Sequence, residues 1–191
     1  MSAVAPSRPA GRLAVAGAAV LAFACVALAV FDFFVTTSST DQFTSTADYL
    51  YTLDGFPFVI GFVALVAGLR ALHAGRDGRL GRFGFLVTTA GGAALCLCLA
   101  ASLATRSENS LGPLYPLGSL VSFLGMILFA VASVRARVLL WWAGPALAVS
   151  WVVGGPVGDG GPLGFKASAL VLAAVAAVVV ALALRGPAVV D

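Results

Sequence analysis

Six apolar stretches occupy most of this 191-residue chain, and each is close to the length that crosses a lipid bilayer. A helix needs roughly 20 apolar residues to cross about 30 Å of hydrocarbon. Charged residues make up only 10% of the chain, whereas a soluble domain usually carries about 25%. The sequence therefore predicts an all-α, polytopic integral membrane protein, folded as one compact bundle of six transmembrane helices with short loops. We expect spans at about 13–35, 55–72, 83–104, 117–134, 138–153 and 167–184.

The basic residues are distributed unevenly between the connections. Nine of the eleven Lys and Arg residues lie before the first span, after the last span, or at the connections that follow spans two and four. Only Arg106 and Lys166 lie in the other connections. Basic residues near the ends of spans resist translocation and stay in the cytoplasm. This distribution predicts a plasma-membrane protein with both termini in the cytoplasm, and the excess of Arg over Lys is typical of GC-rich bacterial genomes.

The composition argues against several kinds of site. The net charge of +3 reflects orientation in the membrane, and the basic residues are not interleaved with aromatic side chains, so we expect no nucleic-acid partner. All three cysteines fall inside apolar spans, which argues against a disulfide framework. His73 is the only histidine, so a zinc site built from several histidines is excluded. We therefore expect no metal and no cofactor.

The first apolar stretch has the basic lead of a signal peptide, in Arg8 and Arg12. However, its apolar run is longer than the 7–15 residues of a signal-peptide core. It also ends in Phe31, Phe33 and Phe34, where a cleavage site requires small residues. We therefore expect an uncleaved helix.

The connection between spans one and two is the most distinctive polar segment. Ser39 and Gln42 match a capping box, and apolar residues then recur at helical spacing, which predicts a short amphipathic helix over about 40–53 on the outer surface. Asp41 and Asp48 would share its outward face. The segment could be a lid over the bundle or a weak cation site. The favoured alternative is a solvated connector, because two carboxylates fall short of the six to eight oxygens that calcium takes.

A candidate outer polar site combines the charged residues near this surface. Its members are Asp32, Asp41, Asp48, Arg106 and Glu108. Asp32 is the only acid within a span and lies about 12 Å from the middle of that span, at 1.5 Å per residue. At that depth we expect a structural or interfacial role, for example a pair with Arg106.

A candidate intramembrane cleft lies at Thr88, Thr89 and Pro145. Proline within a helix removes a hydrogen bond, so we expect Pro145 to kink the fifth span. A small pocket there could take a lipid or another apolar ligand. The favoured alternative is that both threonine hydroxyls bond to the backbone of their own helix, which needs no ligand.

The remaining polar residues predict structural roles. We expect His73 to be an exposed side chain at the inner interface, and Cys96 and Cys98 to be small packing residues. The basic loop from Arg70 to Arg82 either contacts anionic lipid headgroups or only sets the topology, and topology is the favoured interpretation. Small residues allow close helix approach in lipid. We expect such faces at Gly61, Ala64 and Gly68, at Gly118, Ser122 and Gly125, and at Ala173, Ala177 and Ala181.

No family-specific motif is present, and no cluster of acids, bases or metal ligands predicts catalysis. We therefore expect a scaffold, an accessory subunit or a lipid-interacting protein. Its partners would be membrane lipids and either another membrane protein or further copies of this chain. A small transporter or channel for a neutral or apolar solute is the alternative. A membrane enzyme acting on lipids is the least favoured of the three.

Overall fold

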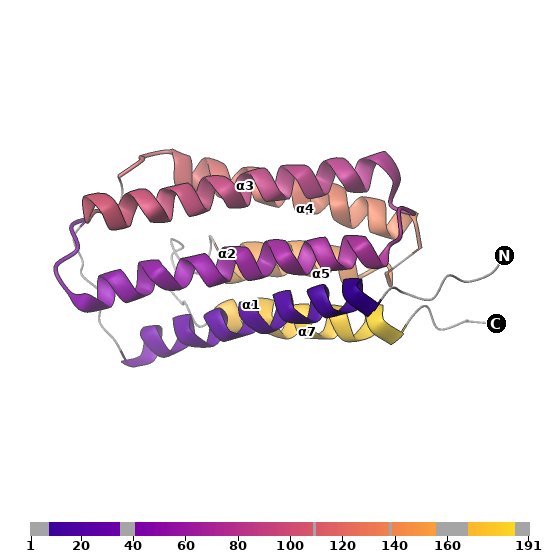
Figure 1. Cartoon of the computed structure of the whole chain (residues 1–191), viewed down its shortest axis with the longest axis horizontal. Coiled ribbons are helices and arrows are strands. Elements are labelled where there is room, and N and C mark those ends of the chain that lie inside the picture. Colours follow the sequence, from indigo (N-terminus) through magenta and orange to yellow (C-terminus); the bar gives the residue numbers. More distant parts are fainter. Residues whose placement is uncertain (1–7, 35–40, 109, 138, 156–167, 186–191) are drawn as a thin grey trace.

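The computed structural model describes residues 8–34, 41–108, 110–137, 139–155 and 168–185 (Figure 1). Within these residues the structure is all helical, as predicted, and contains a single isolated β-bridge between Gln42 and Ser107. The six helices are α1 (Arg8–Phe34), α2 (Thr46–Leu72), α3 (Gly78–Thr105), α4 (Leu114–Arg135), α5 (Ala143–Gly154) and α7 (Ala169–Arg185).

Four of the described helices, α1 to α4, are long and apolar enough to cross a membrane. The other two are shorter, because α5 has 12 residues and α7 has 17. At 1.5 Å per residue these lengths are about 18 and 25 Å, below the ~30 Å of hydrocarbon. Six crossings therefore remain a prediction.

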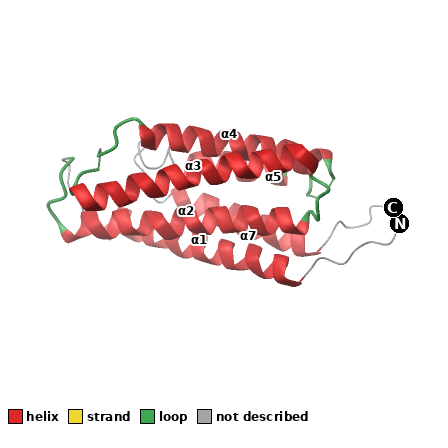
Figure 2. Cartoon of the chain, turned by 45° about the horizontal axis from the view of Figure 1, so that its top comes forward, coloured by secondary structure: helices red, strands yellow, loops and turns green. Residues whose placement is uncertain are grey.

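The helices form a closed arrangement in which each packs on its neighbours in the chain and α7 also packs on α1 (Figures 1 and 2). The start of α1, the turn between α2 and α3 and the end of α7 lie at one end of the bundle (Figure 1). We call this the basic end, because Arg12, Arg76 and Arg185 are exposed there with Arg79, Arg82, Arg135 and Arg137. The connections α1–α2 and α3–α4 lie at the opposite end.

Glycines hold two helix pairs together at backbone contact. A Cβ added at Gly17 or Gly68 would overlap the backbone of the partner helix in the α1–α2 pair, and one at Gly91 or Gly125 would do so in the α3–α4 pair. The predicted small-residue faces of α2 and α4 are therefore used for packing. The predicted alanine face of α7 is wrong. Ala177 and Ala181 are exposed, and the buried face of that helix carries Ala169, Leu172, Ala176, Val179 and Val180.

The predicted outer helix over about 40–53 is not a separate element. Helix α2 begins at Thr46 and continues without a break to Leu72, so residues 46–53 belong to the same helix as the second predicted span. Its N-cap is Ser45, whose Oγ accepts from the Asp48 N–H at 3.3 Å while Asp48 accepts from the Ser45 N–H at 2.8 Å. This capping box replaces the predicted one, whose Ser39 lies outside the described residues. Asp48 is 1% exposed, so its predicted outward position is wrong.

Pro145 occupies a position that differs from the predicted one. Pro145 is the third residue of α5, which begins at Ala143 and not at residue 138. The N–H that proline lacks has no helical partner in a first turn, so the predicted kink has no cause there. Pro57 instead lies well inside α2, because that helix begins at Thr46.

Candidate functional site

A cavity of about 360 Å³ lies between α2, α3, α4 and α5, toward the end opposite the basic end. It forms where α5 stops. Trp151, Gly154 and Gly155 line it from the end of that helix, which is only about 18 Å long at 1.5 Å per residue, whereas α2 extends about 40 Å. We call it the outer pocket. Its apolar lining includes Leu28, Phe58, Val59, Leu95, Cys98 and Leu99, and its polar lining includes Asp41, Tyr51, Thr52, Ser102, Glu108, Tyr115 and Ser119.

An aromatic stack forms one wall of the pocket. The indole of Trp151 is 1% exposed and stacks on Phe62, with ring centroids 4.1 Å apart and 17° between the planes. It also stacks on Phe58, at 5.6 Å and 27°. The Trp151 Nε1–H has no acceptor among the described residues, although a buried indole N–H usually has one. The wall therefore presents a rigid apolar surface to the pocket.

The polar rim is held by backbone pairing between the two outer connections. The Phe43 N–H donates to the Arg106 carbonyl at 2.8 Å, and the Glu108 N–H donates to the Asp41 carbonyl at 2.9 Å. Arg106 ends α3 with φ of 58°, which turns the chain toward this pairing. This backbone pairing brings Asp41 and Glu108 together at the rim of the pocket.

The structure brings together only part of the predicted outer polar site. Asp41 and Glu108 line the outer pocket, as members of one site. Arg106 contributes its carbonyl to the rim, but its side chain is exposed and does not line the pocket. Asp48 is buried beneath the first turn of α2, where it completes the capping box. The side chain of Asp32 lies outside the described part of the chain.

The residues of the predicted intramembrane cleft do not form a cleft. The Thr88 hydroxyl donates to the Gly84 carbonyl and the Thr89 hydroxyl to the Phe85 carbonyl, both at 2.9 Å. This is the arrangement that the alternative prediction described. Neither threonine nor Pro145 lines the outer pocket. Of the two span cysteines considered for packing, Cys96 packs against the core and Cys98 lines the pocket.

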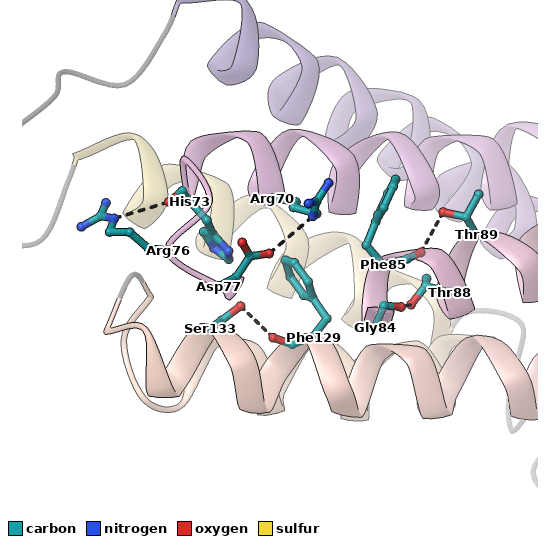
Figure 3. A network of polar contacts seen from close by, with 10 residues as sticks. All are labelled: Arg70, His73, Arg76, Asp77, Gly84, Phe85, Thr88, Thr89, Phe129 and Ser133. Atoms are coloured by element: carbon teal, nitrogen blue, oxygen red, sulfur yellow. Dashed lines mark hydrogen bonds and ion pairs between the residues drawn. The ribbon is translucent and has the colours of Figure 1, made fainter. Parts of the chain in front are cut away.

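A second polar cluster lies at the basic end, where α2 turns into α3 (Figure 3). Arg70 Nε lies 3.5 Å from Asp77 Oδ2, and the Asp77 side chain is 1% exposed. The Arg70 guanidinium also lies 5.4 Å from the centroid of the Phe85 ring. The signal available in the sequence was that Asp77 is the one acid in a connection that carries several arginines.

His73 belongs to the same cluster and is buried, so its predicted exposure is wrong. It is 1% exposed and stacks on Phe129 of α4, with centroids 5.3 Å apart and planes 10° apart. Ala74 and Gly75 have φ of 50° and 80°, and this left-handed turn directs the chain back over the bundle after His73. Neither ring nitrogen has a hydrogen-bond partner among the described residues. Burial, and then the charges of Arg76 and Arg70, lower the pKa of His73 to about 4.

This shift in the His73 pKa predicts a loss of stability in mild acid. In the unfolded chain the His73 ring binds a proton near its ordinary pKa of 6.5, whereas in the folded chain it binds one only near pH 4. The free energy of unfolding therefore falls as the pH drops between these values. By pH 5 the loss is roughly 2 kcal/mol. We expect the melting temperature in detergent to fall more steeply from pH 7.5 to 5 for the wild type than for His73→Gln. Equal slopes would contradict the prediction.

Asp54 is a further buried acid, and it is not among the predicted site residues. It lies in α2, is 8% exposed, and its Oδ2 has no hydrogen-bond partner among the described residues. It does not line the outer pocket. An ionisable residue inside a membrane helix is a candidate for function by default, and the sequence signal was an acid shortly before an apolar run.

The described residues contain no group of three or more His, Cys, Asp or Glu side chains that could hold a metal ion. The outer pocket combines an apolar lining with polar residues at its rim, among them Asp41 and Glu108. No protein-family model, no curated protein and no solved structure matches this chain.

Proposed function

We propose that this chain is a six-span protein of the plasma membrane, with both termini in the cytoplasm, whose outer pocket binds a membrane lipid. In this role it is a lipid-interacting scaffold or accessory subunit. The observation that carries the proposal is the outer pocket itself, in which an apolar floor lies beneath a polar rim. Lipids have the same order of groups, with apolar chains attached to a polar head.

The dimensions of the pocket support a ligand. Its volume of about 360 Å³ falls within the range of about 300–1,000 Å³ that is usual for ligand sites. The floor is built from residues that lie within the long helices, such as Phe58 and Leu95, while Asp41 and Glu108 lie in the outer connections. A lipid can therefore enter with its chain toward the membrane interior and its head toward the outer surface.

The topology is tested with reporter fusions. We expect fusions after residues 45 and 110 to report an outer location and a fusion after residue 78 to report the cytoplasm, because the arginines of the basic end resist translocation. A fusion after residue 160 tests the crossing by α5 and should also report an outer location. A cytoplasmic signal at 45 or 110 would contradict the proposed orientation.

Filling the outer pocket tests the proposed function. Cys98 is 6% exposed and lines the pocket, whereas Leu97 on the same helix is 58% exposed. We expect Cys98→Trp to reduce the amount of lipid that stays bound after purification at least tenfold, with Leu97→Trp as the matched control. Native mass spectrometry of protein released from lipid nanodiscs measures this amount.

A second filling variant, Ser119→Phe, approaches the pocket from α4 and guards against misfolding of the first. Thermal unfolding identifies which variants remain folded. Equal lipid retention by the wild type and by folded variants of both kinds would contradict a lipid site in this pocket.

A small transporter for a neutral or apolar solute is the second candidate, and Asp54 is the observation that favours it. This carboxylate is buried inside α2 and has an oxygen without a hydrogen-bond partner among the described residues, as is typical of transport pathways. Solute flux into liposomes that Asp54→Asn abolishes, in a folded variant, would favour transport over lipid binding.

A further inference from the structure

We infer that the outer pocket selects an uncharged glycerolipid, such as a diacylglycerol, through a hydrogen bond between the Ser119 hydroxyl and an oxygen of the lipid. This inference rests on the proposed function, because it names the class of lipid that the same pocket would hold. Two features of the pocket carry it. One is a buried hydroxyl that the protein itself does not use, and the other is a lining without basic residues.

Ser119 brings an unused hydroxyl to the pocket from α4. The residue lines the pocket and is 5% exposed. Its hydroxyl has no hydrogen-bond partner among the described residues, yet its oxygen is not sealed from solvent. Because the residue is otherwise buried, this oxygen is reached from the pocket. A ligand that displaced water from the hydroxyl without bonding to it would leave a polar group unpaired, which is unfavourable.

The two other Ser and Thr residues of the described lining already use their hydroxyls as donors. The Thr52 hydroxyl donates to the Asp48 carbonyl at 2.8 Å. The Ser102 hydroxyl lies 3.3 Å from the Glu108 carbonyl, to which it donates. A hydroxyl can both donate and accept, so Ser119 can bond to a lipid hydroxyl or to an ester carbonyl. Ser119 is therefore the point at which the pocket can recognise an oxygen of its ligand.

The lining does not suit a phosphate group. Among the described residues that line the pocket there is no Lys, Arg or His. A charged group that leaves water for a pocket needs an opposite charge to replace its hydration. The lining offers a phosphate no such charge, whereas a neutral hydroxyl or ester needs only a hydrogen bond. The lipid group that enters the pocket is therefore uncharged.

The depth and size of the site match the glycerol part of a lipid. Ser119 lies five residues after Leu114, the first residue of α4, and so about 8 Å below the start of that helix at 1.5 Å per residue. At about 30 Å³ for each water-sized group, the cavity of about 360 Å³ holds about a dozen non-hydrogen atoms. Glycerol with two ester groups and the first carbons of its chains has this size. The rest of the chains would extend along the outside of the helices.

The test compares three lipids with the same acyl chains in nanodiscs of the full-length protein. These are dioleoylglycerol, dioleoyl phosphatidic acid, in which a phosphate replaces the hydroxyl, and dioleoyl phosphatidylcholine. Native mass spectrometry counts the lipids that the released protein retains when all three are supplied in equal amounts. We expect dioleoylglycerol to be retained roughly tenfold more than either phospholipid, because each phosphate would lose its hydration without an opposite charge.

Removing the Ser119 hydroxyl tests its role directly. We expect Ser119→Ala to retain about fivefold less dioleoylglycerol than the wild type, which corresponds to the loss of one ordinary hydrogen bond. Ser122→Ala is the matched control on the same helix. The Ser122 hydroxyl also lacks a partner among the described residues, but its oxygen is sealed and the residue does not line the pocket. Thermal unfolding identifies the folded variants, and the comparison of lipids in the wild type does not depend on any variant.

The two proposals fail in different ways. If the wild type retains either phospholipid as well as dioleoylglycerol, the uncharged class is overturned and lipid binding stands. If a folded Ser119→Ala variant retains as much dioleoylglycerol as the wild type, or more, the hydrogen bond is overturned. Retention of none of the three lipids would overturn the proposed function itself.

Discussion

Replacing Gly91 with alanine is expected to destabilise the protein strongly, while the same change at the neighbouring Gly92 has a small effect. A Cβ at Gly91 would overlap the backbone nitrogen of Ser122 and lie 2.7 Å from the Gly118 carbonyl oxygen. A Cβ at Gly92 would meet only side-chain methyl groups, of Val63 at 2.9 Å and Val59 at 3.3 Å. Backbone atoms cannot move aside without separating the helices, whereas valine methyl groups can.

The magnitudes favour a clear difference between the two variants. Overpacking typically costs about 1–3 kcal/mol, and occasionally more where the backbone must shift. Alanine gains up to about 1 kcal/mol over glycine in helix propensity at either position. We therefore expect Gly91→Ala to lose about 2–3 kcal/mol and Gly92→Ala to remain near the wild type. Melting temperatures in a single detergent compare the two directly, and equal values would mean that the α3–α4 pair is not held at backbone contact.

This contrast divides the bundle into two tight pairs. Backbone contacts at Gly17 and Gly68 hold α1 on α2, and those at Gly91 and Gly125 hold α3 on α4. Between the pairs, a Cβ at Gly55 would meet only the side chain of Leu99. Side-chain contacts are easier to rearrange than backbone contacts. The outer pocket lies along this more adaptable interface, where a ligand can be accommodated at the lowest cost in packing.

The helical class of the protein and the contact faces of α2 and α4 could be predicted from the sequence, because both depend on local composition. The small residues at Gly61, Gly68, Gly118 and Gly125 mark the faces where the helices approach, and apolar length predicts the helices themselves. The α7 prediction failed because Ala and Val cover that helix on all sides, so spacing alone does not identify its buried face. The prediction of the outer helix failed because both Ser39–Gln42 and Ser45–Asp48 match a capping box, whereas residues 41–44 are not helical and α2 begins at Thr46.

The candidate site was only partly predictable. Asp41 and Glu108 were grouped because both lie in outer connections, and the topology does bring them to one pocket. Trp151 and Cys98 were not identified as site residues, because the cavity exists only where α5 ends before its neighbours. His73 was placed on the surface because hydropathy gives the depth of a residue along the membrane normal, and the direction of the following turn is not contained in that quantity.

Replacing Asp77 with leucine is expected to destabilise the basic end of the bundle. The Asp77 side chain is 1% exposed, and its partner Arg70 is 33% exposed at a distance of 3.5 Å. Removing one partner of a buried pair costs about 3–5 kcal/mol because the other charge is left uncompensated. Arg70 is partly exposed and its charge is screened by solvent, so we expect a smaller loss of about 2 kcal/mol.

A double-mutant cycle separates this electrostatic loss from other effects. Asp77→Leu adds to the positive bias of the basic end, so a fall in melting temperature would not arise from inverted insertion. Adding Arg70→Met removes the uncompensated charge, and replacement of both partners of such a pair by apolar residues is often neutral. We therefore expect the double variant to recover at least half of the loss, while Arg76→Ala, at an exposed arginine of the same turn, changes stability little. If the losses of stability in the two single variants simply add in the double variant, the ion pair contributes nothing to stability. The burial of Asp77 would then be attributed to its packing over Gly81, where an added Cβ would overlap the carboxylate.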